Sequence, residues 1–423
     1  MNNDELQVLG TEKPKKKNKV KIAIIALVAL LAIGGGIYYY ATSPKQTEII
    51  KTGKKMGEPT IVPELQHAVD SLLRDELEMI DGLQGQVIVM EVETGEILAM
   101  VGQERNYEGK FQSCNNFAYQ QELGSLMMTP SLLALLEEGV DTSYVVHTGM
   151  GIERVDEERL MRDHNWRRGG YGDINLSRAL EVSSNIGISF PVAKFFKGHE
   201  NGFFYLLNKM NFGQPEQIEG IAGLQPSSYS SPKDSDWIDR RIWWSAIGYE
   251  RKIAPIQMLT FYNAIANGGK MVKPTLKTGE IEIINPQIAS KSNIKVMQEV
   301  LRHVVSQGLG MRAGTPILHV SGKTGTSQVG EYDFGEDIYV NEYQLAFCGY
   351  FPADAPKYSM IVSLNKLGLP ASGGGMAGVV FHNIVEWMIT HGMPPVLYLD
   401  DETNDTVRVT SNNVDSIMES INK

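Results

Sequence analysis

Three short stretches of the sequence hold the residue types that nucleophilic catalysis uses. Gly124-Ser125 precedes an apolar run with helical spacing, Ser183-Ser184-Asn185 follows, and Lys323-Thr324-Gly325-Thr326 lies near the end of the chain. A serine at the N-terminus of a buried helix is typical of a nucleophile, but its hydroxyl needs a positioned base to take the proton. Residues three apart in a helix share a face, so the base is expected at position 128, where the sequence has Met128.

Taken singly, each stretch also has an ordinary structural interpretation. Ser-Ser-Asn is common as a helix cap or turn, and Lys-Thr-Gly occurs in surface turns. Met128 fills space at a helix face in the same kind of interpretation, which we favour for it. A second Ser-x-x-Lys, at Ser292 and Lys295, lies between the second and third stretches on a presumed helix, and we do not favour it as the nucleophile.

The N-terminus predicts a membrane anchor. Six lysines within residues 13–21 precede the uncharged stretch 22–41, and twenty residues of helix match the hydrocarbon core of about 30 Å. Tyr38, Tyr39 and Tyr40 fit an aromatic belt at the far interface, and the lysines place the N-terminus in the cytoplasm. A cleaved signal peptide is the alternative, but the apolar run is longer than usual and no A-x-A site follows it.

Charge and cysteine content exclude several classes of partner. Residues 1–21 carry six lysines against three acidic residues, whereas the rest of the chain carries 33 basic and 47 acidic residues. This excess of acidic residues after the predicted anchor, in the part expected outside the cytoplasm, argues against nucleic acid or an anionic membrane surface as a partner. Cys114 and Cys348 could form a disulfide, although Cys348 lies in an apolar run typical of a core position. Neither has a partner at metal-ligand spacing, so we predict no metal.

The order of the predicted elements indicates one large α+β domain. Helical spacing over 63–79 is followed by two β-rich runs within 85–102, helical segments opening at Ser125 and over 173–196 and 251–269, and strands within 320–328, 343–351 and 357–365. This order predicts an antiparallel sheet completed by both ends of the chain around a helical insertion. We therefore divide the chain into a cytoplasmic tail (1–21), anchor (22–41), tether (42–60), main domain (61–393) and polar acidic tail (394–423).

The ordered motif set resembles that of serine acyl-transferases, which include penicillin-binding proteins and class A β-lactamases. The stretches GQVIVMEVETGEILAMVG, GYGDINLSRALEVSSNIG, IGYERKIAPIQMLTFYNAIANGG, FCGYFPADAPKYSMIV and GGGMAGVVFHNIVEWM resemble further landmarks of penicillin-binding transpeptidase domains, in the same order. The resemblance runs from about Pro63 to His391. With its single predicted anchor, the chain is most similar to the monofunctional class B group, located in the bacterial inner (cytoplasmic) membrane with the C-terminal domain outside the cytoplasm.

The resemblance implies a site and a reaction. The serine hydroxyl of the family attacks a D-alanyl-D-alanine stem peptide of peptidoglycan, and an amine from a neighbouring stem resolves the acyl-enzyme. Carried over, the catalytic residues are Ser125, Ser183, Asn185 and Lys323, the substrate-binding residues are Thr324, Gly325 and Thr326, and the N–H groups of Ser125 and Thr326 form the oxyanion hole. No cofactor is implied. The implied partners are stem peptides, β-lactams, the membrane through 22–41, and cell-wall synthesis proteins, with no nucleic acid.

The sequence departs from the family pattern beside the nucleophile. Met128 replaces the lysine base, Glu122-Leu123-Gly124 replaces Glu-Pro-Gly, and the proline comes one place late, as Pro130. Three hypotheses follow: a working D,D-transpeptidase that uses Lys323 as a substitute base, a non-catalytic scaffold in cell-wall growth or division, and, least favoured, a β-lactam sensor. We expect the loss of the lysine at position 128 to impair catalysis. Only about twenty residues precede the predicted span, too few for a signalling domain.

Overall fold

The computed structural model describes residues 48–229, 241–249, 251–333, 339–393, 397–399 and 406–408, with single positions at 232, 413, 415, 416 and 419. The predicted anchor at 22–41 lies outside these residues. Within the described parts, no helix is both long enough and apolar enough to cross a membrane.

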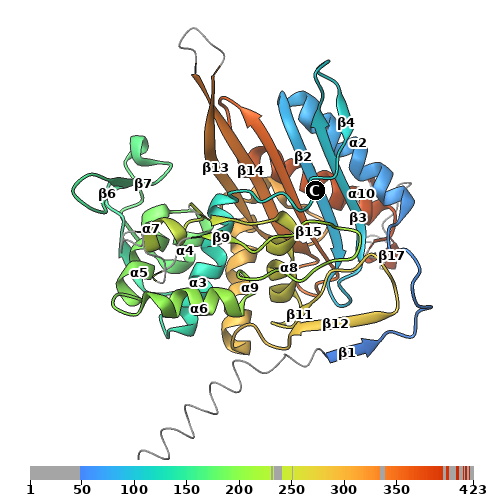
Figure 1. Ribbon diagram of the computed structural model, residues 1–423, viewed down its shortest axis with the longest axis horizontal. Helices are drawn as coiled ribbons and strands as arrows, with labels where there is room; N and C mark the ends of the chain where they lie inside the picture. Colours follow the sequence, from blue (N-terminus) through green and yellow to red (C-terminus); the bar gives the residue numbers. More distant parts are fainter. Residues whose placement is uncertain are drawn as a thin grey trace, which may run out of the picture. The chain divides into compact units, whose positions relative to one another are not determined.

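A six-stranded antiparallel sheet forms the centre of the domain (Figure 1). Its strand order is β13 (Ser321–Asp333), β14 (Tyr339–Phe351), β15 (Tyr358–Leu367), β2 (Gly82–Glu91), β3 (Ile97–Arg105) and β4 (Phe111–Ser113). The early strand β2 pairs with the late strand β15, with Ile88 opposite Ile361. The prediction of an antiparallel sheet completed by both ends of the chain is therefore confirmed.

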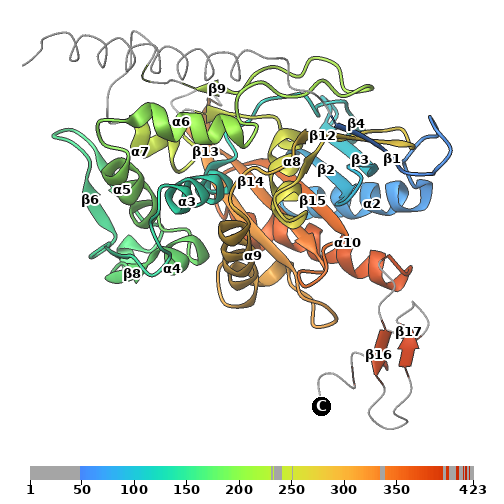
Figure 2. The same ribbon diagram turned by 90° about the horizontal axis from the view of Figure 1, so that it is seen from below.

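Each face of the sheet carries its own hydrophobic core. Because successive side chains in a strand point to opposite faces, Val87 and Val89 belong to one core while Ile88 and Met90 belong to the other. On the first face, β2 and β3 contact α2 (Pro63–Met79), and α10 (Gly378–Thr390) packs beside α2. On the other face, α8 (Pro255–Ala266) lies against β14 and β15 (Figure 2).

The helices between the two halves of the sheet build a second, helical part. Its helix α3 (Met128–Glu137) contacts α5 (Asn185–Phe195), α6 (Glu200–Lys209) and α9 (Lys291–Ser306).

Short elements complete the described chain. They are β1 (Glu48–Lys51), η1 (Gly124–Met127), β5 (Val145–His147), β6 (Ile152–Arg154), β7 (Leu160–Arg162), η2 (Trp166–Arg168), β8 (Asp173–Asn175), α4 (Leu176–Glu181), β9 (Ser228–Tyr229), α7 (Arg241–Ser245), β10 (Arg251–Lys252), β11 (Met271–Val272), β12 (Glu280–Asn285), η3 (Met311–Ala313), η4 (Gly373–Ala377), β16 (Leu397–Leu399) and β17 (Thr406–Arg408).

Two predicted helices differ in detail from the structure. The helix expected to open at Ser125 begins with the 3-10 turn η1, and its α-helical part starts at Met128. The helix expected across 173–196 is interrupted, because α4 ends before Ser183 and α5 begins at Asn185. Apolar periodicity continues across the break, which is why the sequence pattern did not separate the two helices.

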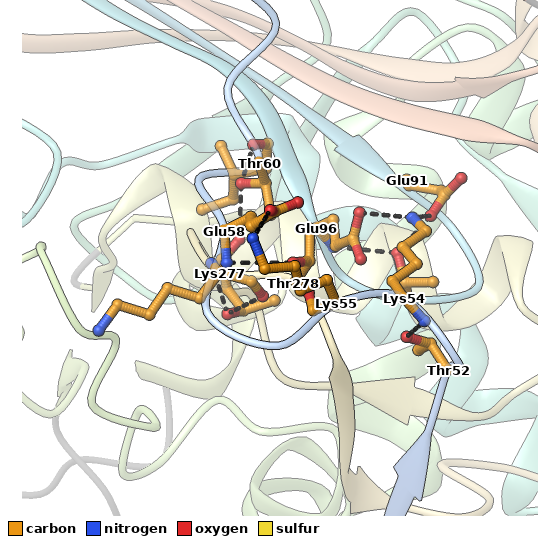
Figure 3. Close-up of polar contacts among 12 residues, drawn as sticks. Thr52, Lys54, Lys55, Glu58, Thr60, Glu91, Glu96, Lys277 and Thr278 are labelled. Carbon is orange, nitrogen blue, oxygen red and sulfur yellow. Dashed lines mark hydrogen bonds and ion pairs between the residues drawn. The ribbon is translucent and has the colours of Figure 1, made fainter.

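The segment predicted as a tether is described from Glu48 onward, and it is joined to the domain by hydrogen bonds and ion pairs (Figure 3). Strand β1 pairs with β12, and the Lys54 ammonium lies 2.7 Å from a Glu96 carboxylate oxygen. Further along, the Thr60 hydroxyl donates to the carbonyl of Ile97 at 2.6 Å. The division of the chain at residue 61 stays a prediction.

The two cysteines are both free thiols in the structure. Cys348 is fully buried in the core between the sheet and the helical part, as its apolar surroundings predicted. Burial raises the pKa of the Cys114 thiol to about 11, so this thiol is protonated at neutral pH.

Candidate active site

Ser125 lies in η1, immediately before α3, and its side chain is partly exposed while its neighbours Leu126 and Met127 are buried. The Met128 N–H donates to the Ser125 carbonyl, an i to i+3 bond of the 3-10 type. The fully buried phenol of Tyr262 fixes this turn, because its hydroxyl donates to the Leu126 carbonyl at 3.1 Å. The start of α3 is thus held by a residue of α8 that the sequence analysis missed.

Close backbone approach joins the Ser125 turn to the outer strand of the sheet. Gly124 has φ +53°, and a Cβ added there would lie 3.1 Å from the Thr326 carbonyl oxygen. A Cβ added at Gly325 would lie 2.5 Å from the carbonyl oxygen of Leu123. Glycine at both positions is therefore what lets η1 pack directly against β13. The first and third predicted motifs meet at this contact.

Ser183 connects α4 to α5 in a strained conformation. Its φ of +52° is in the left-handed region, which costs a non-glycine residue about 1 kcal/mol or more. The Ser184 N–H donates to the Ala179 carbonyl at 2.9 Å and the Ser183 N–H to the Leu180 carbonyl at 3.2 Å. This is the helix-ending Schellman pattern, with serine at the position where glycine is usual. The turn directs the Ser183 hydroxyl toward β13, where Lys323 donates to it.

A buried carboxylate holds the second motif in place. The Ser184 hydroxyl caps α5 by accepting from the Gly187 N–H at 2.8 Å and donates to Asp163 at 2.8 Å. The same carboxylate accepts from the Ile186 N–H at 3.1 Å. Burial raises the pKa of Asp163, and these hydrogen bonds oppose the effect. Asn185, the third member of the motif, donates from its amide nitrogen to the Arg162 carbonyl at 2.8 Å.

Lys323 is fully buried, and burial has a large effect on its charge. Its ammonium donates to the Ser183 hydroxyl and, at 2.9 Å, to the Thr324 carbonyl. Burial lowers the pKa of Lys323 from 10.5 to about 7, because a buried ammonium loses its hydration. Among the described residues, no carboxylate lies within ion-pair distance of this lysine to oppose the effect. About half of the Lys323 side chains are therefore neutral amines at pH 7.

The rest of the third motif lines the outer edge of the sheet. Thr324 is buried, whereas Thr326 is exposed and accepts from the Gly373 N–H at 2.9 Å. A Cβ added at Gly373 would lie 2.1 Å from the Gly325 carbonyl oxygen, so the start of η4 also packs directly on β13. The structure therefore brings together Ser125, Ser183, Asn185, Lys323 and the Thr324–Thr326 strand, as the motifs predicted; their chemical roles stay predictions.

Met128 is fully buried and belongs to the core of the helical part. In a 3-10 turn, positions i and i+3 lie on the same side, so Met128 occupies the place next to Ser125 where a base is expected. A thioether is a weak acceptor and cannot titrate. None of the hydrogen bonds found among the described residues involves the Ser125 hydroxyl.

The alternative serine lies away from this cluster. Ser292 and Lys295 are exposed in the first turns of α9. The adjoining Ser290 and Asn293 bond the Glu137 carboxylate, at the opposite end of α3 from Ser125. Ten residues of helix separate the two ends, about 15 Å. The structure thus supports Ser125 rather than Ser292 as the candidate nucleophile.

A histidine–tyrosine pair beside the second motif was not predicted. His164 follows Asp163 directly, and its Nε2 lies 2.6 Å from the Tyr171 hydroxyl. Partial burial lowers the pKa of His164, and the positive charges of Arg168 and Lys323 lower it further. Burial and the neighbouring charges therefore both favour the neutral imidazole of His164. Its position depends on a loop whose path no local sequence pattern specifies.

Comparisons with known proteins agree with this geometry. The sequence profile of the family described as penicillin binding protein transpeptidase domain matches residues 85–386. The chain is 25% identical over 375 residues to penicillin-binding protein PbpB of Mycobacterium tuberculosis, covering 81% of this chain and 54% of the relative. It is 28% identical over 327 residues to stage V sporulation protein D of Bacillus subtilis, covering 70% and 48%. The chain thus spans about half the length of the curated relatives it matches.

A solved structure shares the fold. The transpeptidase domain of Burkholderia pseudomallei penicillin-binding protein 3 aligns with a TM-score of 0.66 at 23% identity, covering 79% of this chain and 97% of that domain. The family match covers most of the chain and includes all three motifs. The chain therefore belongs to the family of penicillin-binding protein transpeptidase domains.

Proposed function

We propose that the protein is a membrane-anchored class B type penicillin-binding protein of the bacterial inner membrane that binds peptidoglycan stem peptides ending in D-alanyl-D-alanine and acylates slowly. The observation that carries the proposal is the contrast within one site. The turn η1 packs directly on β13, and Ser183 of the second motif is hydrogen-bonded to Lys323 of the same strand. Beside Ser125, however, the buried Met128 occupies the position where the base is expected.

Lys323 is the group most suited to replace that base. A lysine with a pKa of about 7 is a neutral proton acceptor in half of the molecules at pH 7. It is already hydrogen-bonded to the Ser183 hydroxyl. The proposal assigns Ser183 as the relay that passes the proton of Ser125 to Lys323. Lys323 also serves as the cation expected to bind the carboxylate of the substrate. Using one residue for both tasks impairs catalysis, because a neutral amine attracts the carboxylate less strongly.

The expected loss of rate follows from the missing base. A positioned general base contributes about 10²- to 10⁴-fold to a reaction rate. The oxyanion hole and substrate contacts retain part of the acceleration when such a base is lost. We therefore expect slow acylation of Ser125 rather than none.

The experiment measures release of D-alanine from a stem peptide by the full chain in detergent micelles. We expect slow release that is abolished in the Ser125→Ala variant, while saturable peptide binding remains. Lys323→Met should abolish release as well, because it removes the group that we propose as the proton acceptor. Release by Ser125→Ala at the wild-type rate would show that the nucleophile is assigned wrongly.

A second candidate function is a non-catalytic scaffold that binds stem peptides or cell-wall synthesis proteins. The complete burial of Met128 favours it, because the core around position 128 is packed for an apolar side chain. Saturable stem-peptide binding with no D-alanine release, in wild type and Ser125→Ala alike, would support this function. Release at a rate typical of the family would exclude it.

A further inference from the structure

Four residues beside the second motif form an exposed basic and aromatic surface, which we call the arginine–tryptophan patch: Arg162, Trp166, Arg167 and Arg168. The Arg162 guanidinium lies 5.5 Å from the centre of the Trp166 ring and that of Arg167 lies 4.9 Å from it. Both distances are within the range of cation–π attraction. Trp166 therefore holds two guanidinium groups on its ring while all three arginines stay exposed.

The positive charge of the patch is not neutralised locally. None of the three patch arginines forms an ion pair with a carboxylate of the described residues. Arg154 of the adjoining β6–β7 hairpin donates at 2.9 Å to the Glu157 backbone carbonyl of the same hairpin, which satisfies a donor without neutralising its charge. Three unpaired arginines are conspicuous in a chain whose residues after 21 carry 33 basic against 47 acidic side chains.

The loop that carries the patch is firmly built. A Cβ added at Gly170 would lie 2.2 Å from the backbone of Met150, and one added at Gly151 would lie 3.1 Å from the Cα of Trp166. The Asp163 N–H donates to the Gly151 carbonyl at 2.9 Å, and the Asp163 side chain is fully buried. Backbone contacts on both sides of Trp166 therefore fix the position of the patch.

The patch borders the candidate active site. Asn185 of the second motif donates to the Arg162 carbonyl at 2.8 Å, so patch and motif share a backbone contact. The positive charges of Arg168 and Lys323 both act on His164 and lower its pKa, in addition to the larger effect of burial. Arg168 also acts on Tyr171, the hydrogen-bond partner of His164. The patch therefore lies beside both the second motif and the His164–Tyr171 pair.

Resting on the proposed function, we propose that the arginine–tryptophan patch binds carboxylate groups of an acidic peptide whose C-terminal end lies at Lys323 and Ser183. Arginine binds carboxylates through paired N–H donors, and stacking on Trp166 limits the conformational freedom that binding would remove. Binding of the C-terminal carboxylate at Lys323 and of upstream carboxylates at the patch gives the peptide one direction along the surface. The patch thus selects for acidic side chains upstream of the residues that react.

The test measures peptide binding by fluorescence anisotropy with the full chain in detergent micelles. The probe is a labelled synthetic peptide that ends in D-alanyl-D-alanine and has two glutamates upstream; a peptide with glutamines in their place is the comparison. An exposed ion pair changes affinity by about two- to fivefold. The Arg167→Gln and Arg168→Gln double variant should therefore bind the acidic peptide about five- to tenfold more weakly and the glutamine peptide unchanged.

The matched control is the Arg154→Gln and Arg159→Gln double variant, which removes the same charge from the neighbouring hairpin. It should leave both affinities unchanged, and raising the salt concentration should reduce the preference of the wild type for the acidic peptide. Equal weakening in both double variants would overturn the inference in favour of general charge attraction. Equal binding of the two peptides by the wild type would overturn it too.

Two further outcomes separate this inference from the proposed function. If the wild type binds the glutamine peptide but does not distinguish the acidic one, the inference is wrong and the proposed function stands. If neither peptide binds, both are wrong. Stronger displacement of the acidic peptide by polyphosphate than by polyglutamate of equal charge would indicate a phosphate polymer as the ligand and contradict the inference.

Discussion

Replacing Lys323 by methionine should change the pH dependence of stability, because this lysine is buried without an opposing charge. Its pKa is about 7 in the folded protein, against 10.5 for an unperturbed lysine. Between these values the unfolded chain binds more protons than the folded chain, so Lys323 makes stability rise with pH. The stability gained from having a neutral Lys323 is fully present above about pH 10.5, and it is lost as the pH falls to 7. The slope approaches about 1.4 kcal/mol per pH unit once the pH exceeds the folded pKa, so the free energy of unfolding gains about 2 kcal/mol from pH 7 to pH 9.

The assay is urea unfolding of wild type and Lys323→Met at several values between pH 6 and pH 9. Methionine has a similar length and no titrating group, so subtracting the two curves removes the contributions of all other residues. Lys323→Met should be the more stable protein at pH 6, and its advantage should shrink by about 3 kcal/mol by pH 9. Lys295→Met is the control, because an exposed lysine loses little hydration on folding. A constant difference between wild type and Lys323→Met would refute the reasoning.

Three further predictions concern the same site. Ser184→Ala should lower the free energy of unfolding by about 2–3 kcal/mol in urea unfolding, because it removes the α5 cap and a partner of the buried Asp163 carboxylate; a loss under 0.5 kcal/mol would contradict this. Gly373→Ala should reduce penicillin labelling of Ser125, because the added Cβ would lie 2.1 Å from a backbone oxygen of β13; unchanged labelling would show that the strand can shift without effect. Labelling of Ser125 should accelerate as the pH rises through about 7, where Lys323 becomes a neutral amine; a rate that falls over this range would exclude Lys323 as the base.

The sheet and its two packed faces could be predicted from the sequence, because their determinants are local and repeated. Alternation in β2, with Val87 and Val89 on one face and Ile88 on the other, reflects burial on both sides of the sheet. Helix α2 has Pro63 at its start and apolar side chains at helical spacing. Both patterns arise from neighbouring residues, so a single sequence reveals them.

The parts of the site that the sequence did not reveal depend on contacts between distant segments. Ser183 adopts a left-handed conformation that serine rarely takes, and the apolar periodicity continues across it, so the sequence pattern indicated one continuous helix. Asp163 lies 21 residues before Ser184, whose hydroxyl donates to its carboxylate. The sequence around Asp163 does not mark this carboxylate as buried. The motifs named candidate residues whose roles stay predictions, whereas the residues that position them became visible only in the fold.

The central claim is that the site is preserved and that the group missing at position 128 limits its chemistry. Labelling with a fluorescent penicillin, read by intact mass, tests this most directly in wild type, Met128→Lys and Ser125→Ala. We expect slow labelling of the wild type, none of Ser125→Ala, and labelling of Met128→Lys that is faster by about 10²-fold or more. Labelling of Met128→Lys no faster than that of the wild type would contradict the claim.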